Sequence, residues 1–176
     1  MEHFTEIKPG RKPFKRAYLN IMLWFVGKAT QAAAKVDDEV KQEFDSLPAG
    51  FTFSLGAFPN GPCMIVGKDD NGVVKYLGGR IDNVQVDMKM TLKSIELLFR
   101  LFTFRESTPV ANSMDRLYVE GDIPHACTAV RILNIVQVYL LPKFLAKLAI
   151  KRYPKWSLKR HTWNRLMVNL RTITGF

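Results

Sequence analysis

Apolar and polar residues follow two different periods along this chain, and the changes of period divide it into predicted helices and strands. Apolar positions recur at helical spacing over residues 14–35, which predicts a helix whose first turn Pro13 can open. A second helix is predicted over residues 37–46, since acidic side chains crowd its start, where the helix dipole favours negative charge.

Residues 51–90 are predicted to form strands, because apolar and polar residues alternate there and turn sequences separate the runs. Asn71 and Gly72 form an Asn-Gly pair, which tolerates positive φ and is typical of a hairpin. Residues 84–90 alternate at every step, so we expect one face of the sheet to be covered and the other to face water. The predicted strands are residues 51–55, 63–66, 73–77 and 84–90.

The helical period returns after these strands. Thr91 is expected to cap a helix that runs to about residue 103, and Glu96 and Arg100 are expected to form an i,i+4 ion pair on its polar face. Residues 114–120 alternate again, which predicts one more strand before the next helix.

The helix predicted over residues 123–140 is unusually apolar. Asp122 is a good N-cap and Pro124 suits the first turn, so a helix is favoured over the strand that the β-branched content also permits. A helix this apolar is either buried on most sides or lines a cavity. Its polar residues form only a narrow stripe, made of Arg131, Asn134 and Gln137.

The net charge of +10 comes entirely from the C-terminal third of the chain. Residues 1–122 contain all 16 acidic residues and 16 of the 26 Lys and Arg, whereas residues 123–176 contain the other 10 bases and no acid. Helices are predicted over residues 142–152 and again after Pro154. Such asymmetry indicates an anionic partner, either a membrane or a nucleic acid.

Catalytic machinery is not evident in the sequence. His125 and Cys127 form an isolated His-x-Cys with no second ligand pair at metal spacing, so we interpret them as a helix-start histidine and a small buried cysteine. We therefore predict that the chain is not an enzyme and needs neither a cofactor nor a metal. The 2 cysteines imply no disulfide framework, and no apolar run reaches the length of a membrane span. These features predict a cytoplasmic location.

The bulky apolar side chains, among them 12 Phe and 7 Met, permit two interpretations. They can pack closely in an ordinary core, or they can leave a cavity for an apolar molecule between the sheet and the helices. If there is a cavity, the candidate ligand-binding residues are Val86, Met88, Ile95, Phe99, Phe102, Leu133, Val136 and Leu140.

A resemblance favours the cavity. Residues 82–90 run into the helix predicted after them, and residues 117–122 end in Gly-Asp before the apolar helix; in this order they resemble the sterol carrier protein type 2 family. The resemblance spans about residues 51–150. It implies a five-stranded mixed or antiparallel sheet covered by helices, an apolar tunnel for sterols, fatty acyl chains or other lipids, and no catalytic set. Asp115 stands where family members often carry Gly.

The resemblance also suggests how the chain is organised. We expect one α+β domain in which residues 1–50 contribute a leader and helices that pack on the core, residues 51–150 form a lipid-binding core, and residues 151–176 form a basic C-terminal extension.

The basic C-terminal segment combines cations with aromatic rings. Three lysines recur at i, i+4 and i+8, a pattern that suits an anionic membrane surface. The same mixture suits RNA binding, and it also suits a solvated face that aids solubility. The candidate membrane-contact residues are Lys143, Lys147, Lys151, Trp156 and Arg160.

Together these patterns predict a non-catalytic protein that binds an apolar lipid in a tunnel between sheet and helices. Transfer of that lipid and peripheral docking on anionic membranes extend the same hypothesis. A nucleic-acid-binding protein that acts through the C-terminal segment is the alternative, and a homodimer stays open beside a monomer.

Overall fold

A five-stranded mixed sheet organises the computed structural model of the chain, which describes residues 12–58, 60–80, 84–103, 110, 113–140 and 163–174. The strand order is β3-β2-β1-β4-β5. β1 pairs in parallel with β4, and the other neighbouring strands are antiparallel. The predicted five-stranded mixed sheet is therefore confirmed. The strands are β1 (Thr52–Ala57), β2 (Cys63–Lys68), β3 (Val74–Gly78), β4 (Met88–Leu92) and β5 (Leu117–Glu120).

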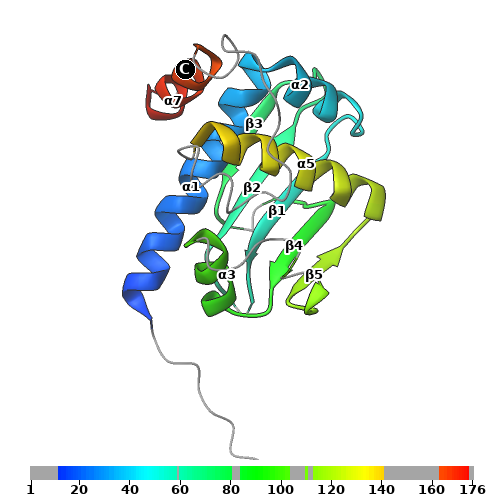
Figure 1. Cartoon of the computed structure of the whole chain (residues 1–176). Coiled ribbons are helices and arrows are strands. Elements are labelled where there is room, and N and C mark those ends of the chain that lie inside the picture. Colours follow the sequence, from blue (N-terminus) through cyan, green and yellow to red (C-terminus); the bar gives the residue numbers. More distant parts are fainter. Residues whose placement is uncertain are drawn as a thin grey trace, which may run out of the picture.

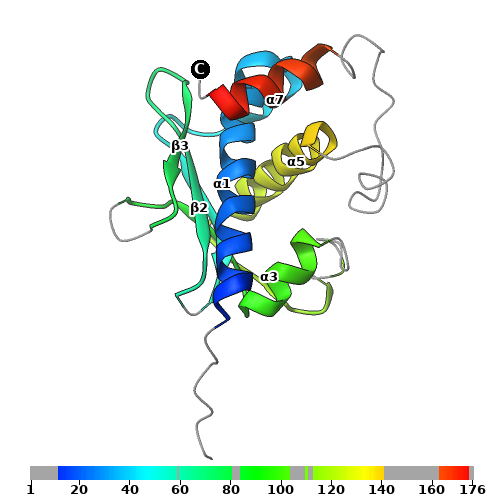
Figure 2. The same ribbon diagram turned by 90° about the vertical axis from the view of Figure 1, so that its left-hand side faces the viewer.

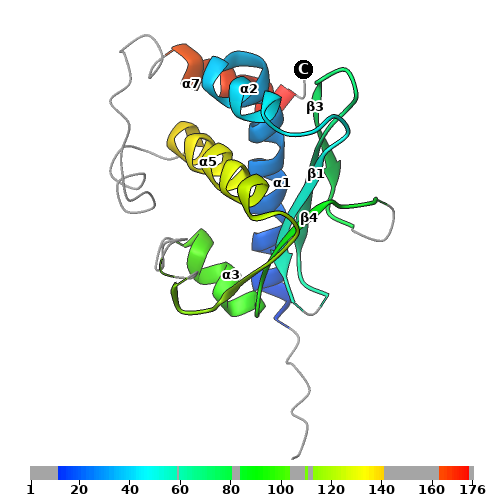
Figure 3. The same ribbon diagram turned by 90° about the vertical axis from the view of Figure 1, so that its right-hand side faces the viewer.

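The helices of the described residues cover one face of this sheet (Figures 1 and 2). Figure 3 shows the same two layers from the opposite side, with the helices and the sheet exchanged in the view. The helices confirm the predicted α+β class. They are α1 (Pro13–Val36), α2 (Asp38–Asp45), α3 (Ile95–Phe102), α5 (Ile123–Leu140) and α7 (Arg165–Thr174).

Helix α1 is an integral part of the core, although it precedes the sheet in the sequence. It contacts β2 and β3 as well as α2, α3, α5 and α7. Leu19 and Leu23 of α1 are fully buried in the same cluster as Phe53 and Met88 of the sheet. Burial of such side chains is the main favourable contribution to folding, at roughly 25 cal/mol per Å² of apolar surface.

The start of β4 and the start of α3 differ from the sequence prediction. β4 begins at Met88, so residues 84–87 are not part of the strand, and Thr91 and Leu92 belong to β4 instead of to a helix. Ser94 is the N-cap of α3, since its side chain accepts a hydrogen bond from the backbone N–H of Leu97. The local pattern could not reveal this boundary because pairing with β1 extends β4 as far as Leu92.

The centre of the sheet is buried on both faces, so the expected wet face is wrong for β1 and β2. On the face away from the helices, the Thr52 hydroxyl donates to the carbonyl of Gln85 at 2.8 Å. The backbone N–H of Thr52 donates to the Asp87 carboxylate, also at 2.8 Å. Residues leading into β4 therefore lie against this face. The alternation of buried and more exposed residues holds in β3, β4 and β5.

The start of β5 contains one residue in a conformation that glycine normally adopts. The predicted strand over residues 114–120 is shorter in the structure, which starts β5 at Leu117. Asp115, two residues earlier, has a φ of 54°. Asp tolerates this left-handed region better than most residues, although Gly occupies it without steric cost. Asp115, which stands where members of the resembled family often carry Gly, is therefore a residue with positive φ.

The C-terminal segment is described only in part. α7 agrees with the amphipathic helix predicted after Pro154, whereas the helix predicted over residues 142–152 lies outside the described residues. None of the helices in the described part is both long and apolar enough to span a bilayer.

Candidate functional site

An apolar cavity lies between the sheet and three helices. Its volume is about 150 Å³. α1, α3 and α5 and the strands β1, β4 and β5 all contribute side chains to the wall. The described lining residues are Met22, Phe25, Val26, Leu55, Met90, Leu92, Leu101, Phe102, Leu117, Val130, Leu133, Asn134, Gln137 and Leu140.

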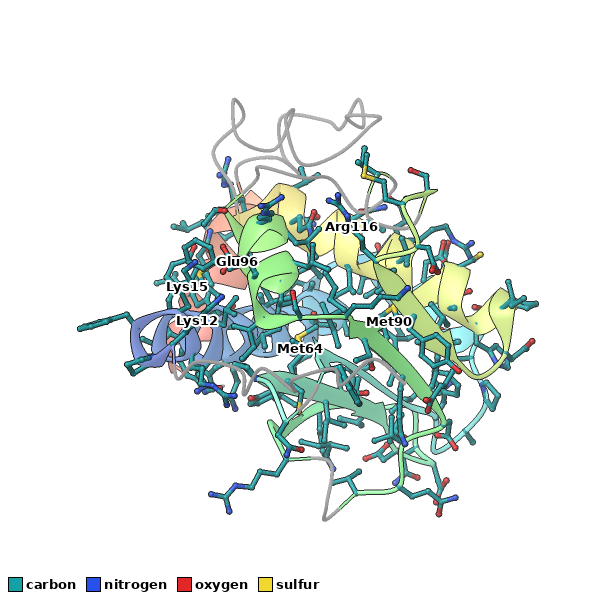
Figure 4. The ribbon with its side chains drawn as sticks, turned by 90° about the horizontal axis from the view of Figure 1, so that it is seen from below. Lys12, Lys15, Met64, Met90, Glu96 and Arg116 are labelled. Carbon is teal, nitrogen blue, oxygen red and sulfur yellow. The ribbon has the colours of Figure 1, made fainter. Side chains whose placement is uncertain are left out.

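The sheet side of the wall follows from strand alternation. Leu55 of β1 pairs with Met90 of β4, and Met90 pairs with Val119 of β5. Because side chains alternate between the two faces of a strand, Met90 and Leu92 point to the same side. Figure 4 labels Met64 and Met90 on the side of the sheet that faces the helices. The cavity is thus part of the layer between sheet and helices.

Helix α5 lines the cavity and is buried by several neighbours. It contacts α1, α2, α7 and β4. This arrangement explains why the helix is apolar on most sides, which the sequence had left open between close packing and a cavity wall. Both occur: Ile132 and Val136 are fully buried in the core, while Leu133 and Leu140 line the cavity.

The eight predicted ligand-binding residues separate into two groups. Phe102, Leu133 and Leu140 line the cavity. The other five do not contribute to its described wall: they are Val86, Met88, Ile95, Phe99 and Val136. Met88 and Val136 are fully buried core residues, and Val86 precedes β4 in an irregular segment. That Phe102, Leu133 and Leu140 contact a ligand stays a prediction.

Sequence reasoning missed the contribution of α1 to the wall. Met22, Phe25 and Val26 line the cavity, although none of them was among the predicted ligand-binding residues and residues 1–50 were expected to pack on the core. The signal available was the second apolar row of the helix, since these residues recur at the i, i+3 and i+4 spacing of one helix face.

A cluster of charges and rings fixes α3 against α1. The Glu96 carboxylate accepts hydrogen bonds from Lys15 at 2.7 Å and from Lys12 at 3.1 Å (Figure 4). These lysines lower the pKa of Glu96 from 4.5 to about 2. The predicted ion pair between Glu96 and Arg100 is therefore wrong, because Glu96 pairs across to α1 instead.

Aromatic contacts reinforce the same junction. The rings of Tyr18 and Phe99 meet edge to face at a centroid distance of 5.4 Å. Lys15 Nζ lies 5.0 Å from the centroid of Phe99. Edge-to-face pairs and cation–π contacts each add a modest stabilisation beyond burial. Phe99 therefore helps to position α3, whose Leu101 and Phe102 line the cavity.

The structure places the two residues of the His-x-Cys pair in different surroundings. His125 packs edge to face on Phe51, and its Nδ1 lies 3.2 Å from the Asp122 carboxylate. Cys127 is exposed, so its expected burial is wrong; the buried cysteine is Cys63. Within the described ranges, no three His, Cys, Asp or Glu side chains come together as a metal site.

The candidate membrane-contact residues lie outside the described residues: they are Lys143, Lys147, Lys151, Trp156 and Arg160. An exposed apolar stripe follows in the sequence: Trp163, just before α7, is 55% exposed, and Leu166 and Leu170 of α7 are 52% and 49% exposed. Arg165 lies between Trp163 and Leu166 in the sequence, Arg171 follows Leu170, and no acidic residue lies in α7.

Several solved structures are similar to this chain at low sequence identity. The ubiquinone synthesis protein UbiJ-SCP2 matches 70% of this chain and 99% of its own at 13% identity and a TM-score of 0.45. The sterol carrier protein 2 of Yarrowia lipolytica, in its apo form, matches 69% of this chain and 99% of its own at 13% identity and a TM-score of 0.41.

A sterol carrier protein domain of Helicoverpa armigera matches 73% of this chain and 94% of its own at 13% identity and a TM-score of 0.40. No protein-family model and no curated protein sequence matches the chain. Solved structures of sterol carrier proteins are thus among those to which this chain is similar.

Proposed function

We propose that this protein binds an apolar lipid in the cavity bounded by α1, α3, α5 and the sheet. The observation that carries the proposal is the wall itself, in which twelve of the fourteen described side chains are apolar. An apolar guest that leaves water for such a wall gains roughly 25 cal/mol per Å² of its buried surface. The role is one of binding, with no reaction assigned to the chain.

The cavity volume limits what the present conformation can hold. A volume of about 150 Å³ suits a benzene-sized group, whereas drug-sized ligands occupy roughly 300–1,000 Å³. A whole acyl chain or sterol therefore requires the wall to move or the cavity to lengthen into a tunnel. Met22 and Met90 line the cavity, and unbranched methionine side chains repack easily around guests of different shape.

Docking on an anionic membrane is the second part of the proposal. The exposed stripe of Trp163, Leu166 and Leu170 can enter the headgroup region, and the surrounding cations can bind lipid phosphates. Docking would let an apolar ligand pass between bilayer and cavity without crossing water, which is the step that lipid transfer requires. The proposed nucleic-acid alternative depends on the same cations, and of its candidate stacking rings Trp163 is described and exposed, whereas Tyr153 and Trp156 lie outside the described residues.

Native mass spectrometry of freshly purified protein tests the lipid-binding proposal. We expect a population with added mass, from which organic extraction recovers an acyl or sterol-like molecule. Co-sedimentation with vesicles tests docking: vesicles of phosphatidylcholine with phosphatidylserine should retain the protein at low salt, and pure phosphatidylcholine should not. Protein that neither carries lipid after purification nor takes it up would contradict lipid binding. Equal retention by both kinds of vesicle would contradict docking on anionic membranes.

A further inference from the structure

Two amide side chains interrupt the otherwise apolar wall of the cavity. Asn134 and Gln137 lie three residues apart on α5, so both project from the same face of the helix. Every other described lining residue is apolar. The polar stripe seen in the sequence is therefore placed partly on the wall that faces the proposed ligand.

Arg131 is the first residue of the same polar stripe, but it is not among the described residues that line the cavity. Its Nε donates to the Glu43 carboxylate of α2 at 2.8 Å, and its Nη2 donates to the Thr128 hydroxyl at 2.8 Å. Arg131 thus serves to join α5 to α2. The two amides that follow it have no such role, because within the described residues neither Asn134 nor Gln137 makes a side-chain hydrogen bond or ion pair.

An amide in an apolar wall is costly unless it finds a partner. Each side chain offers two N–H donors and one carbonyl acceptor, and both residues are only partly exposed. Leaving a buried polar group unpaired costs on the order of 1–3 kcal/mol, so a ligand that pairs with these groups recovers part of this cost. Close packing alone would have been served better by leucine or methionine at both positions.

The lack of charged side chains in the described wall restricts which ligand groups can bind there. Among the described lining residues there is no Lys, Arg, His, Asp or Glu. An ionised carboxylate or phosphate placed in such a wall would lose its hydration without gaining a counter-charge, which is far more costly than burying a neutral group. Amides, in contrast, pair well with neutral oxygens as donor and with hydroxyls as both donor and acceptor.

We propose that Asn134 and Gln137 recognise an uncharged polar group on the lipid, a hydroxyl, a ketone carbonyl or an ester, and that the cavity takes neutral lipids in preference to ionised fatty acids. This inference rests on the proposed function and adds the class of ligand to it. The apolar part of the molecule lies against the sheet, α1 and α3, and its oxygen faces α5.

Matched compounds with the same ten-carbon chain test the proposal on the delipidated full chain. The compounds are decan-1-ol, methyl decanoate, decane and sodium decanoate, each used at pH 8 to displace an apolar fluorescent dye. The variant is Asn134→Leu with Gln137→Met, which keeps the approximate size of both side chains. Two surface changes of the same kind, Asn20→Leu and Gln42→Met, serve as the control because both positions are exposed.

We expect the variant to weaken binding of the alcohol and the ester by about three- to tenfold, as the loss of one or two neutral hydrogen bonds requires. Decane should bind the variant at least as well as the unchanged protein, and the control should match the unchanged protein for every compound. Decanoate should bind the unchanged protein at least tenfold more weakly than decanol. In the unchanged protein, decanol should also shift the side-chain amide NMR signals of both residues.

Three outcomes overturn the inference while the proposed function stands. They are equal loss of decane and decanol affinity in the variant, tighter binding of decanoate than of decanol, and amide signals that decanol leaves unmoved. Binding of none of the four compounds or the dye by the unchanged protein would overturn the proposed function itself, and the inference with it.

Discussion

The buried Tyr139 hydroxyl of α5 donates a hydrogen bond to the Asp37 carboxylate, which lies at the junction of α1 and α2. The other oxygen of Asp37 accepts from the backbone N–H groups of Glu39 and Val40 and so caps α2. One carboxylate therefore joins three helices. It also fixes the end of α5, where Gln137 and Leu140 line the cavity.

Removing that hydroxyl should destabilise the fold. In Tyr139→Phe, the buried Asp37 carboxylate loses a donor, and hydrogen bonds to charged groups contribute about 1.5–3 kcal/mol. We predict a loss of that size in the free energy of unfolding, measured by urea denaturation. Tyr118→Phe is the matched control, since Tyr118 is 56% exposed, and should change stability by less than about 0.5 kcal/mol. Equal effects of the two changes would show that the hydrogen bond contributes little.

Gly27 should resist the substitution that usually stabilises a helix. Replacing Gly by Ala inside a helix normally gains about 1 kcal/mol. A Cβ at Gly27 would overlap the ring of Tyr76, because α1 packs closely on β3. We predict that Gly27→Ala lowers the free energy of unfolding by about 1–3 kcal/mol, as overpacked cores do. In the presence of Tyr76→Val the same change should cost much less, and a double-mutant cycle with additive effects would refute the close contact.

The junction of α1 and α3 should respond to acid. The pKa of Glu96 is about 2 in the folded protein because Lys15 and Lys12 bind its carboxylate, against an ordinary 4.5. A lowered carboxyl pKa means that the stabilisation is fully present above pH 4.5 and is lost as the pH falls toward 2. NMR titration of the Glu96 carboxyl should show this low midpoint, and high salt should raise it, because the pair is partly exposed.

The Glu96→Gln variant provides the matching stability measurement. It should unfold with a weaker pH dependence than the unchanged protein between pH 4.5 and pH 2. A midpoint near 4.5 in the titration, or an unchanged pH dependence in the variant, would show that the lysines do not hold the carboxylate in solution.

Asp115 should tolerate glycine and reject a β-branched residue. Its φ of 54° is easily reached by Gly, so Asp115→Gly should leave the melting temperature unchanged or raise it. The exposed pair that Asp115 makes with Lys93 contributes little to oppose this gain. Asp115→Val should lower stability by about 1–3 kcal/mol. Similar melting temperatures for the two variants would show that the backbone at this position is relaxed.

Much of the fold could be predicted from local patterns. The extents of α1 and α5 follow from helical spacing and from Pro13 and Pro124 in their first turns, and the hairpin between β2 and β3 follows from Asn71-Gly72. The boundary between β4 and α3 could not be predicted in the same way. Thr91 is a good cap and a good strand residue, and its pairing with Gly56 of β1 and Tyr118 of β5 selects the strand.

The cavity wall was less predictable, because its members come together only in the tertiary structure. Phe99 has the helical spacing of a wall residue, yet its ring turns to Tyr18 and Lys15 of α1. Asn134 and Gln137 were visible as a polar stripe, but nothing local distinguished them from Arg131. The difference depends on Glu43, which lies 88 residues away in the sequence and binds Arg131.

Filling the cavity provides the most direct test of lipid binding. Val130→Phe adds a ring to the wall, whereas Val73→Phe makes the same change at a residue that is 44% exposed. Binding of an apolar fluorescent dye to the delipidated protein should be measured for both variants and for the unchanged chain. We predict one bound dye per chain, at least a tenfold loss of affinity in Val130→Phe, and no loss in Val73→Phe. Dye affinity that survives in Val130→Phe, with the variant shown to be folded, would contradict binding in this cavity.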